Sequence, residues 1–82
     1  MTKEMQEELK KMNPKPVLGK KCLTPKQVAK LIGVSKNTVL NWARKTKRGE
    51  LDMPLMSAPL KRALIFIPIS EFVAWYEYQA QN

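Results

Sequence analysis

Side chains that can bond to nucleobases are concentrated in one short segment of the chain. Asn37 and Asn41 stand four positions apart, so a helix would carry both amides on one face. An asparagine amide can bond both N6 and N7 of an adenine in the major groove of duplex DNA. Ser35, Lys36 and Thr38 adjoin them, and we predict that these five residues read bases, with Lys36 also suited to a phosphate contact. The structural alternative is that Asn37 and Thr38 only support the start of a helix.

A second set of residues suits contacts with phosphates, which position a protein on DNA without reading its sequence. This set comprises Thr24, Lys26, Arg44, Lys45, Lys47 and Arg48. Lys61 and Arg62 would lie at the tip of a hairpin and suit insertion into the minor groove, with a solvated turn as the alternative.

The distribution of charge agrees with a polyanionic partner. The 82 residues include 15 Lys and Arg against 7 Asp and Glu, a net charge of +8. Twelve of the fifteen basic residues lie between Leu9 and Gly49, where no acidic residue occurs. A solvated surface would explain scattered charges, but a segregated basic half favours a face that binds nucleic acid.

The composition excludes several classes of function. The chain has no His and a single Cys, Cys22, so an ordinary zinc site and a Ser-His or Cys-His catalytic pair are out of reach. We expect no enzyme activity, no metal, no cofactor and no small-molecule ligand. The longest apolar run, residues 63–67, is far below the about 20 residues of a membrane-spanning helix. A cytoplasmic protein is expected, with Cys22 as a small apolar residue.

Two helices joined by a tight turn must position the polar segment. Thr24 to Gln27 forms a capping box with Pro25 at the first helical position, which predicts a helix ending at Ile32-Gly33. Ser35 then caps a second helix over 36–47. A small Ala29 in the first helix, with Val39 and Trp42 in the second, completes the spacing of a helix-turn-helix.

The C-terminal half changes from helical to strand-like spacing. Residues 53–57 and 63–67 predict a hairpin, and Pro68 should end its second strand. Ser70 should cap a last helix. Its inward stripe is predicted to comprise Phe72, Trp75, Tyr76 and Gln79. We interpret Trp42, Phe66, Phe72 and Trp75 as core residues rather than base-stacking platforms.

The N-terminal segment, residues 1–21, is predicted to lie outside the domain formed by residues 22–82. Residues 1–12 can form an amphipathic helix without a strong cap, with an apolar stripe of Met1, Met5, Leu9 and Met12. Residues 13–16 indicate an extended linker. The helix could bind a partner, but a frayed tail or a lid on the domain is favoured.

Several of these segments together resemble a known family. They are Leu23–Ala29, Gly33–Ser35, Thr38-Val39, Trp42, Arg48–Leu51, Ile67–Phe72 and Trp75. They resemble the excisionase-type branch of the MerR-like winged-helix domains. The resemblance covers about residues 22–78. It implies a small α+β winged helix-turn-helix with a two-stranded hairpin wing and a C-terminal helix.

The sequence departs from the family pattern at three places. Asn41 stands where Arg is common in the family. Gly49 follows Trp42 by seven positions, where a spacing of about four is usual. Residues 52–62 form a segment longer than a minimal wing. A recognition helix about one turn longer is therefore expected.

The resemblance implies an excisionase-like factor that binds double-stranded DNA and helps a tyrosine-type integrase excise a phage or mobile element. A transcription regulator that uses the same surface is the nearest alternative. An adaptor for an acidic protein and an RNA-binding protein are further alternatives. One short reading helix covers about one half-site, so cooperative self-association on DNA is also expected.

Overall fold

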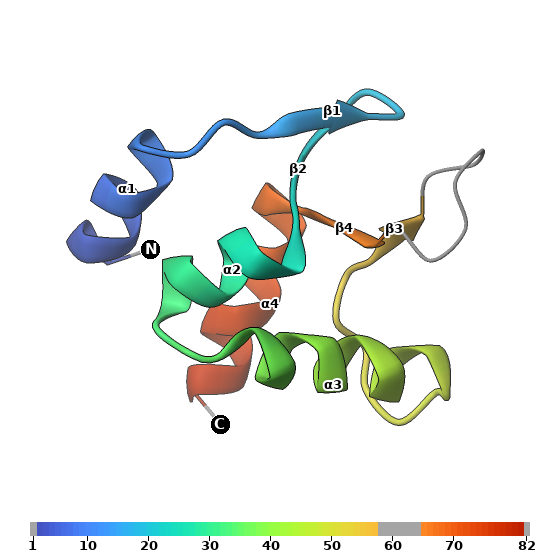
Figure 1. Cartoon of the computed structure of the whole chain (residues 1–82). Coiled ribbons are helices and arrows are strands. Elements are labelled where there is room, and N and C mark those ends of the chain that lie inside the picture. Colours follow the sequence, from blue (N-terminus) through green and yellow to red (C-terminus); the bar gives the residue numbers. More distant parts are fainter. Residues whose placement is uncertain (1, 58–64, 82) are drawn as a thin grey trace.

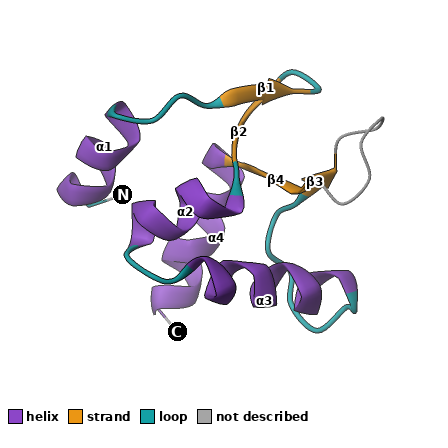
Figure 2. Ribbon diagram, in the orientation of Figure 1, coloured by secondary structure: helices purple, strands orange, loops and turns teal. Residues whose placement is uncertain are grey.

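A computed structural model describes residues 2–57 and 65–81 of the chain (Figure 1). The described part contains four helices and four strands. In chain order they are α1 (Lys3–Lys10), β1 (Lys15–Val17), β2 (Lys20–Leu23), α2 (Pro25–Ile32), α3 (Lys36–Lys47), β3 (Met56–Ser57), β4 (Ile65–Pro68) and α4 (Ile69–Gln81). Figure 2 shows the strands on one side of the helices, with α3 crossing the lower edge of the domain. The predicted α+β class is confirmed.

The strands form one antiparallel sheet in the order β1-β2-β4-β3. The predicted hairpin is present, but its described pairing is short: Met56 pairs with Phe66 and Ser57 with Ile65. Only this pair of strands was predicted from the sequence. The structure adds a second pairing, in which Cys22 faces Pro68, so β4 is central to the sheet. Lys61 and Arg62, predicted at the hairpin tip, lie outside the described residues.

The segment expected to be a linker is partly a strand. Residues 15–17 pair with β2, with Lys15 opposite Cys22 and Pro16 opposite Lys21. Pro16 lacks a backbone N–H, but β1 is the edge of the sheet, where a strand proline is tolerated. The linker prediction was wrong at these residues because strand pairing supplied hydrogen-bond partners that the Pro-rich sequence did not indicate.

Both predicted helix caps of the helix-turn-helix are confirmed. The Thr24 hydroxyl accepts from the Gln27 backbone N–H at 3.3 Å, and the Thr24 N–H donates to Gln27 Oε1 at 3.0 Å. Gly33 has a φ of +75°, the left-handed conformation that ends α2. The Ser35 hydroxyl accepts from the Thr38 N–H at 3.2 Å and begins α3. The turn between the helices is therefore determined by local chemistry.

The core lies where α2 and α3 cross and where β4 and α4 cover them. Val28, Val39, Ala43 and Ile67 have no exposed surface, and Ala29 is nearly buried. Cys22 is also fully buried, as expected of a small apolar residue. Full burial of a valine or isoleucine side chain in this core stabilises the fold by about 1.5–3 kcal/mol.

The last helix differs from the prediction at its start and on its inner face. It begins at Ile69, directly after strand residue Pro68, so Ser70 lies inside the first turn and is not the cap. Val73 is buried beside Phe72, whereas Gln79, predicted to point inward, is exposed. The inward positions of Phe72, Trp75 and Tyr76 were predicted correctly, but the inward position of Gln79 was not. Trp75 and Tyr76 are half-buried and pack on the core.

The N-terminal helix is capped and packed rather than frayed. The Thr2 hydroxyl accepts from the Met5 N–H at 3.2 Å, so the prediction of a helix without a strong cap was wrong. Met5 is only 7% exposed, and Leu9 and Met12 pack against the core. In Figure 1 α1 lies beside the C-terminal end of α2. Of the interpretations left open by the sequence, a lid on the domain describes this arrangement.

Candidate nucleic-acid interface

The outward face of α3 carries an unbroken polar stripe. Asn37, Asn41, Arg44 and Arg48 recur at i, i+4, i+7 and i+11, the spacing of one helix face, and all four are exposed. The opposite face holds Val39 and Ala43 in the core. This division of polar and apolar positions leaves the stripe turned away from the rest of the domain. The structure therefore brings both predicted asparagines together on one surface.

Asn41 and Arg44 are bonded to each other within this stripe. Arg44 Nη1 donates to Asn41 Oδ1 at 3.0 Å, and both side chains are exposed. The carbonyl oxygen of an amide has two lone pairs, so Asn41 can accept from Arg44 and from one further donor. The bond restrains two side chains that would otherwise sample many rotamers. It gives the centre of the stripe a defined arrangement of donors and acceptors.

The remaining residues of the predicted reading set lie at the start of α3. Ser35, Lys36 and Asn37 are exposed, while Thr38 is half-buried. The Ser35 and Thr38 hydroxyl oxygens are 3.0 Å apart and share a hydrogen bond. Both hydroxyls thus take part in the helix cap, which corresponds to the supporting role that the sequence left open for Thr38.

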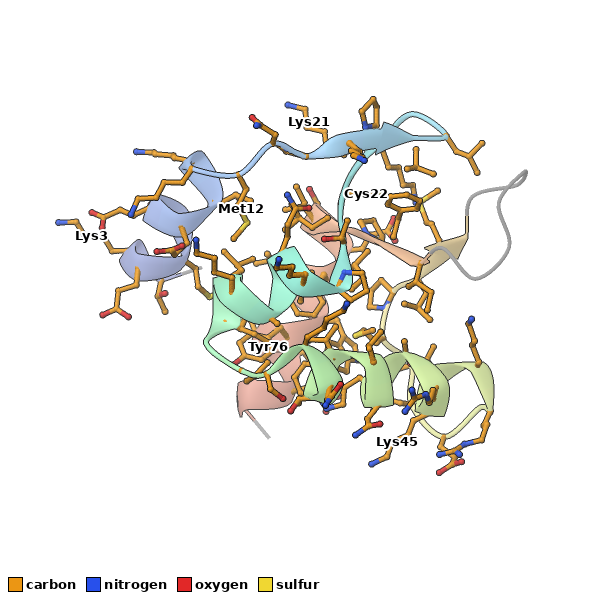
Figure 3. The ribbon with its side chains drawn as sticks, viewed as in Figure 1. Lys3, Met12, Lys21, Cys22, Lys45 and Tyr76 are labelled. Carbon is orange, nitrogen blue, oxygen red and sulfur yellow. The ribbon has the colours of Figure 1, made fainter. Side chains whose placement is uncertain are left out.

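The basic residues expected to contact phosphates surround the end of α3. Lys45 and Lys47 are exposed, and Figure 3 shows Lys45 pointing away from the body of the domain. Arg48 Nε lies 2.6 Å from Glu50 Oε2, so part of its charge is already compensated. On α2, Lys26 is exposed, whereas the Thr24 hydroxyl is used by the capping box.

Several bonds hold the end of α3 against the rest of the fold. The Glu50 N–H donates to the Lys45 carbonyl at 2.8 Å and the Gly49 N–H to the Thr46 carbonyl at 3.1 Å, a Schellman ending with Gly49 at φ +81°. The Thr46 hydroxyl also accepts from the Met53 N–H at 3.3 Å. These bonds turn the chain back toward the hairpin and fix the orientation of the helix.

An aromatic contact joins α3 to α4. The rings of Trp42 and Trp75 meet edge to face with their centroids 5.9 Å apart. The Trp75 indole N–H donates to Asp52 Oδ1 at 2.8 Å, which ties α4 to the loop after α3. Trp42 therefore packs inside the domain, as predicted, although it is half-buried rather than fully buried. This contact supports the inner side of α3, opposite the exposed polar stripe.

One hollow of the described surface has a charged lining that is mainly acidic. It has a volume of about 560 Å³ and lies between α1 and the C-terminal end of α2. Glu4, Glu7 and Glu8 line it together with a single lysine, Lys30. Three carboxylates would repel a phosphate backbone. This hollow is therefore a poor candidate for the nucleic-acid interface.

A smaller groove adjoins the start of α3 and includes a residue that the sequence analysis missed. Lys15 of β1 and Lys36 of α3 both line it, although 21 positions separate them in the chain. Lys15 was overlooked because its segment was interpreted as a linker. Only its pairing with β2 brings it to this place, and no local sequence signal indicates that pairing.

Comparison with protein families identifies this arrangement. Residues 22–79 match the helix-turn-helix domain family, a span that runs from β2 into α4. The chain belongs to the helix-turn-helix domain family. This helix-turn-helix domain uses α2 and α3 as its two helices, and membership of the family indicates binding to double-stranded DNA. The family is typically non-enzymatic and includes excisionase-like proteins.

Comparisons of the helix-turn-helix chain with curated proteins and with solved structures gave no significant match. Among the described residues, no helix is both long and apolar enough to cross a membrane.

Proposed function

We propose that this protein is a sequence-specific, excisionase-like architectural factor that binds double-stranded DNA and assists an integrase in excising a phage or mobile element. In this proposal α3 enters the major groove and the β3–β4 hairpin contacts the adjacent backbone or minor groove. The protein would act in the cytoplasm, at the nucleoid.

The observation that carries the DNA-binding part is the exposed stripe of α3. It offers two asparagine amides for base edges, with arginine and lysine side chains on either side for phosphates. Trp42, on the inner side of the same helix, packs against α4 and leaves the stripe outward. A rigid helix with polar groups aimed outward can discriminate bases at low entropic cost.

Binding is tested by gel shift with a randomised duplex pool, followed by selection of the preferred sequence. We expect a duplex with a defined motif to be enriched and single-stranded RNA to compete poorly. Equal competition by RNA would favour the RNA-binding alternative. Absence of any nucleic-acid complex, with capture of acidic proteins instead, would favour an adaptor.

The excisionase role is supported by the family, which includes excisionase-like proteins. It is tested with the integrase of a neighbouring gene, if one is present, and a plasmid that carries the two junctions of the element. We expect the protein to raise the yield of excised circle. DNA binding without any effect on excision, together with repression of an adjacent promoter, would favour the transcription regulator.

We further propose that the protein is a monomer in free solution and binds neighbouring sites cooperatively, with bending of the DNA. The charge of +8 should hold free copies apart, and DNA should relieve the repulsion by neutralising it. Analytical ultracentrifugation should give a monomer, and a circular-permutation gel shift should show position-dependent mobility. A stable dimer without DNA would contradict the first half, and independent, unbent occupancy of adjacent sites the second.

A further inference from the structure

A groove beside the reading helix combines a basic rim with an apolar floor. Its volume is about 310 Å³. The rim carries Lys15 from β1 and Lys36 from the first position of α3, both exposed. The floor includes Leu40 of α3 and Phe66 of β4, both half-buried. Thr24, the cap of α2, also lines the groove. Residues of β1, α2, α3 and β4 therefore meet at this one surface.

Neither lysine is engaged by an acidic partner among the described residues, in contrast to their neighbours. Lys20 of the same hairpin pairs with Glu71, and Arg48 of the same helix pairs with Glu50. The groove therefore presents two positive charges without a compensating carboxylate, which favours a bound anion.

The apolar floor limits which anion fits. A free inorganic anion would gain nothing from Leu40 and Phe66, whereas a sugar-phosphate chain presents an apolar sugar edge between charged phosphates. Lys36 and Leu40 of α3 line the groove, and the outward stripe of the same helix is proposed to read bases. The DNA strand that leaves the major groove beside α3 would therefore pass over this floor.

We infer that this groove is a binding site for the deoxyribose-phosphate backbone of one DNA strand. Lys15 and Lys36 contact its phosphates, and Leu40 and Phe66 pack against a sugar. This inference rests on the proposed DNA binding and extends it to β1, which lies outside the helix-turn-helix match at residues 22–79. The hairpin of β1 and β2 thereby holds the DNA backbone, in addition to the proposed contact of the β3–β4 hairpin.

The first test compares the salt dependence of duplex binding for wild type and Lys15→Ala. Each neutralised phosphate contributes about 0.9 to the magnitude of the log–log slope. We expect Lys15→Ala to lower that magnitude by about 0.9. The matched control is Lys21→Ala, which removes the same charge from the paired strand. Figure 3 shows Lys21 on the side of the sheet turned away from α3. Its slope should equal that of wild type.

The second test locates the contact. Neutral methylphosphonates are placed one at a time along the selected duplex, and binding of wild type and Lys15→Ala is measured for each. At one or two positions the methylphosphonate should weaken wild type but leave Lys15→Ala unaffected, because both changes remove the same contact. Additive losses at every position, or equal slopes for Lys15→Ala and Lys21→Ala, would overturn the inference. Failure of wild type to bind any duplex would instead overturn the proposed function.

Discussion

The side chain of Arg44 donates from Nη1 to Oδ1 of Asn41 at 3.0 Å, one turn earlier on the same exposed face of α3. This bond couples the base-reading and phosphate-binding roles that the sequence assigned to the two residues separately. A guanidinium anchored in this way keeps further N–H donors for DNA, because arginine has five. The pair should therefore behave as a unit in mutational tests.

Replacement of Asn41 by Ala should relax sequence specificity more than it weakens total binding. A good bidentate base contact contributes about 1–3 kcal/mol of discrimination, and its loss affects only the preferred sequence. The measurement is the ratio of affinities for the selected duplex and a scrambled one. Lys45→Ala is the control and should weaken both duplexes alike, since phosphates carry no sequence information. Equal losses on both duplexes for Asn41→Ala would show that Asn41 does not read a base.

Binding of wild type to duplex DNA should depend strongly on salt. Counterion release by several phosphate-facing lysines and arginines gives an expected log–log slope of about −4 to −7. Titration of a fluorescent duplex between low and moderate salt measures the slope. A value near zero would rule out the basic face as the DNA-binding surface.

Gly33→Ala should destabilise the helix-turn-helix without a steric clash. A Cβ added at Gly33 meets no atom within 4 Å, so the cost comes from its φ of +75° alone. The left-handed conformation costs an L-residue about 1–2 kcal/mol. Urea unfolding should show that loss, and Gly33→Asn should show a smaller one because asparagine tolerates this conformation. Unchanged stability of Gly33→Ala would mean that the turn relaxes freely.

Met5→Ala should lower the free energy of unfolding of the whole domain, although Met5 precedes the residues 22–79 that match the family. Its side chain is 7% exposed and belongs to the main core cluster. Truncation of a buried methionine costs about 2–5 kcal/mol, and we expect the lower end for a helix at the edge of the core. Gln6→Ala, at an exposed neighbour, is the control. Thermal unfolding that is unaffected by Met5→Ala would indicate that α1 detaches from the domain in solution.

The thiol of Cys22 should make stability fall in alkaline solution. Burial raises the pKa of Cys22 above its usual value of 9.0, and the nearby Lys20 only partly opposes this shift. Well below pH 9 the thiol is protonated in both the folded and the unfolded state and contributes no pH dependence. As pH rises through 9 toward the folded-state pKa, the unfolded chain loses its proton more readily, so the folded state loses stability.

Cys22→Ala removes this dependence and provides the comparison. The free energy of unfolding of wild type, minus that of Cys22→Ala, should decrease between pH 7.5 and pH values above 9. Urea unfolding at both pH values measures it. A constant difference would show that the thiol has a similar pKa in the folded and unfolded states.

Local sequence signals were sufficient to predict the helix-turn-helix. Thr24, Gln27, Gly33 and Ser35 set the ends of α2 and α3, and the structure has those helices over the predicted residues. Caps and left-handed glycines act within one turn of the chain, so their effect is readable without knowledge of the rest of the fold. The exposed stripe that carries Asn37 and Asn41 follows directly from the helical period.

The sheet, and the residues that it places beside α3, depend on pairing between distant segments of the chain. Cys22 pairs with Pro68 across 46 positions, and Lys15 reaches the groove beside Lys36 only because β1 pairs with β2. A strand of three residues with a proline has almost no propensity of its own, and its hydrogen bonds depend on a partner from elsewhere in the chain. The apolar stripe that contains Met5 was predicted from the helical period, but its burial depended on the apolar surface of the assembled helices.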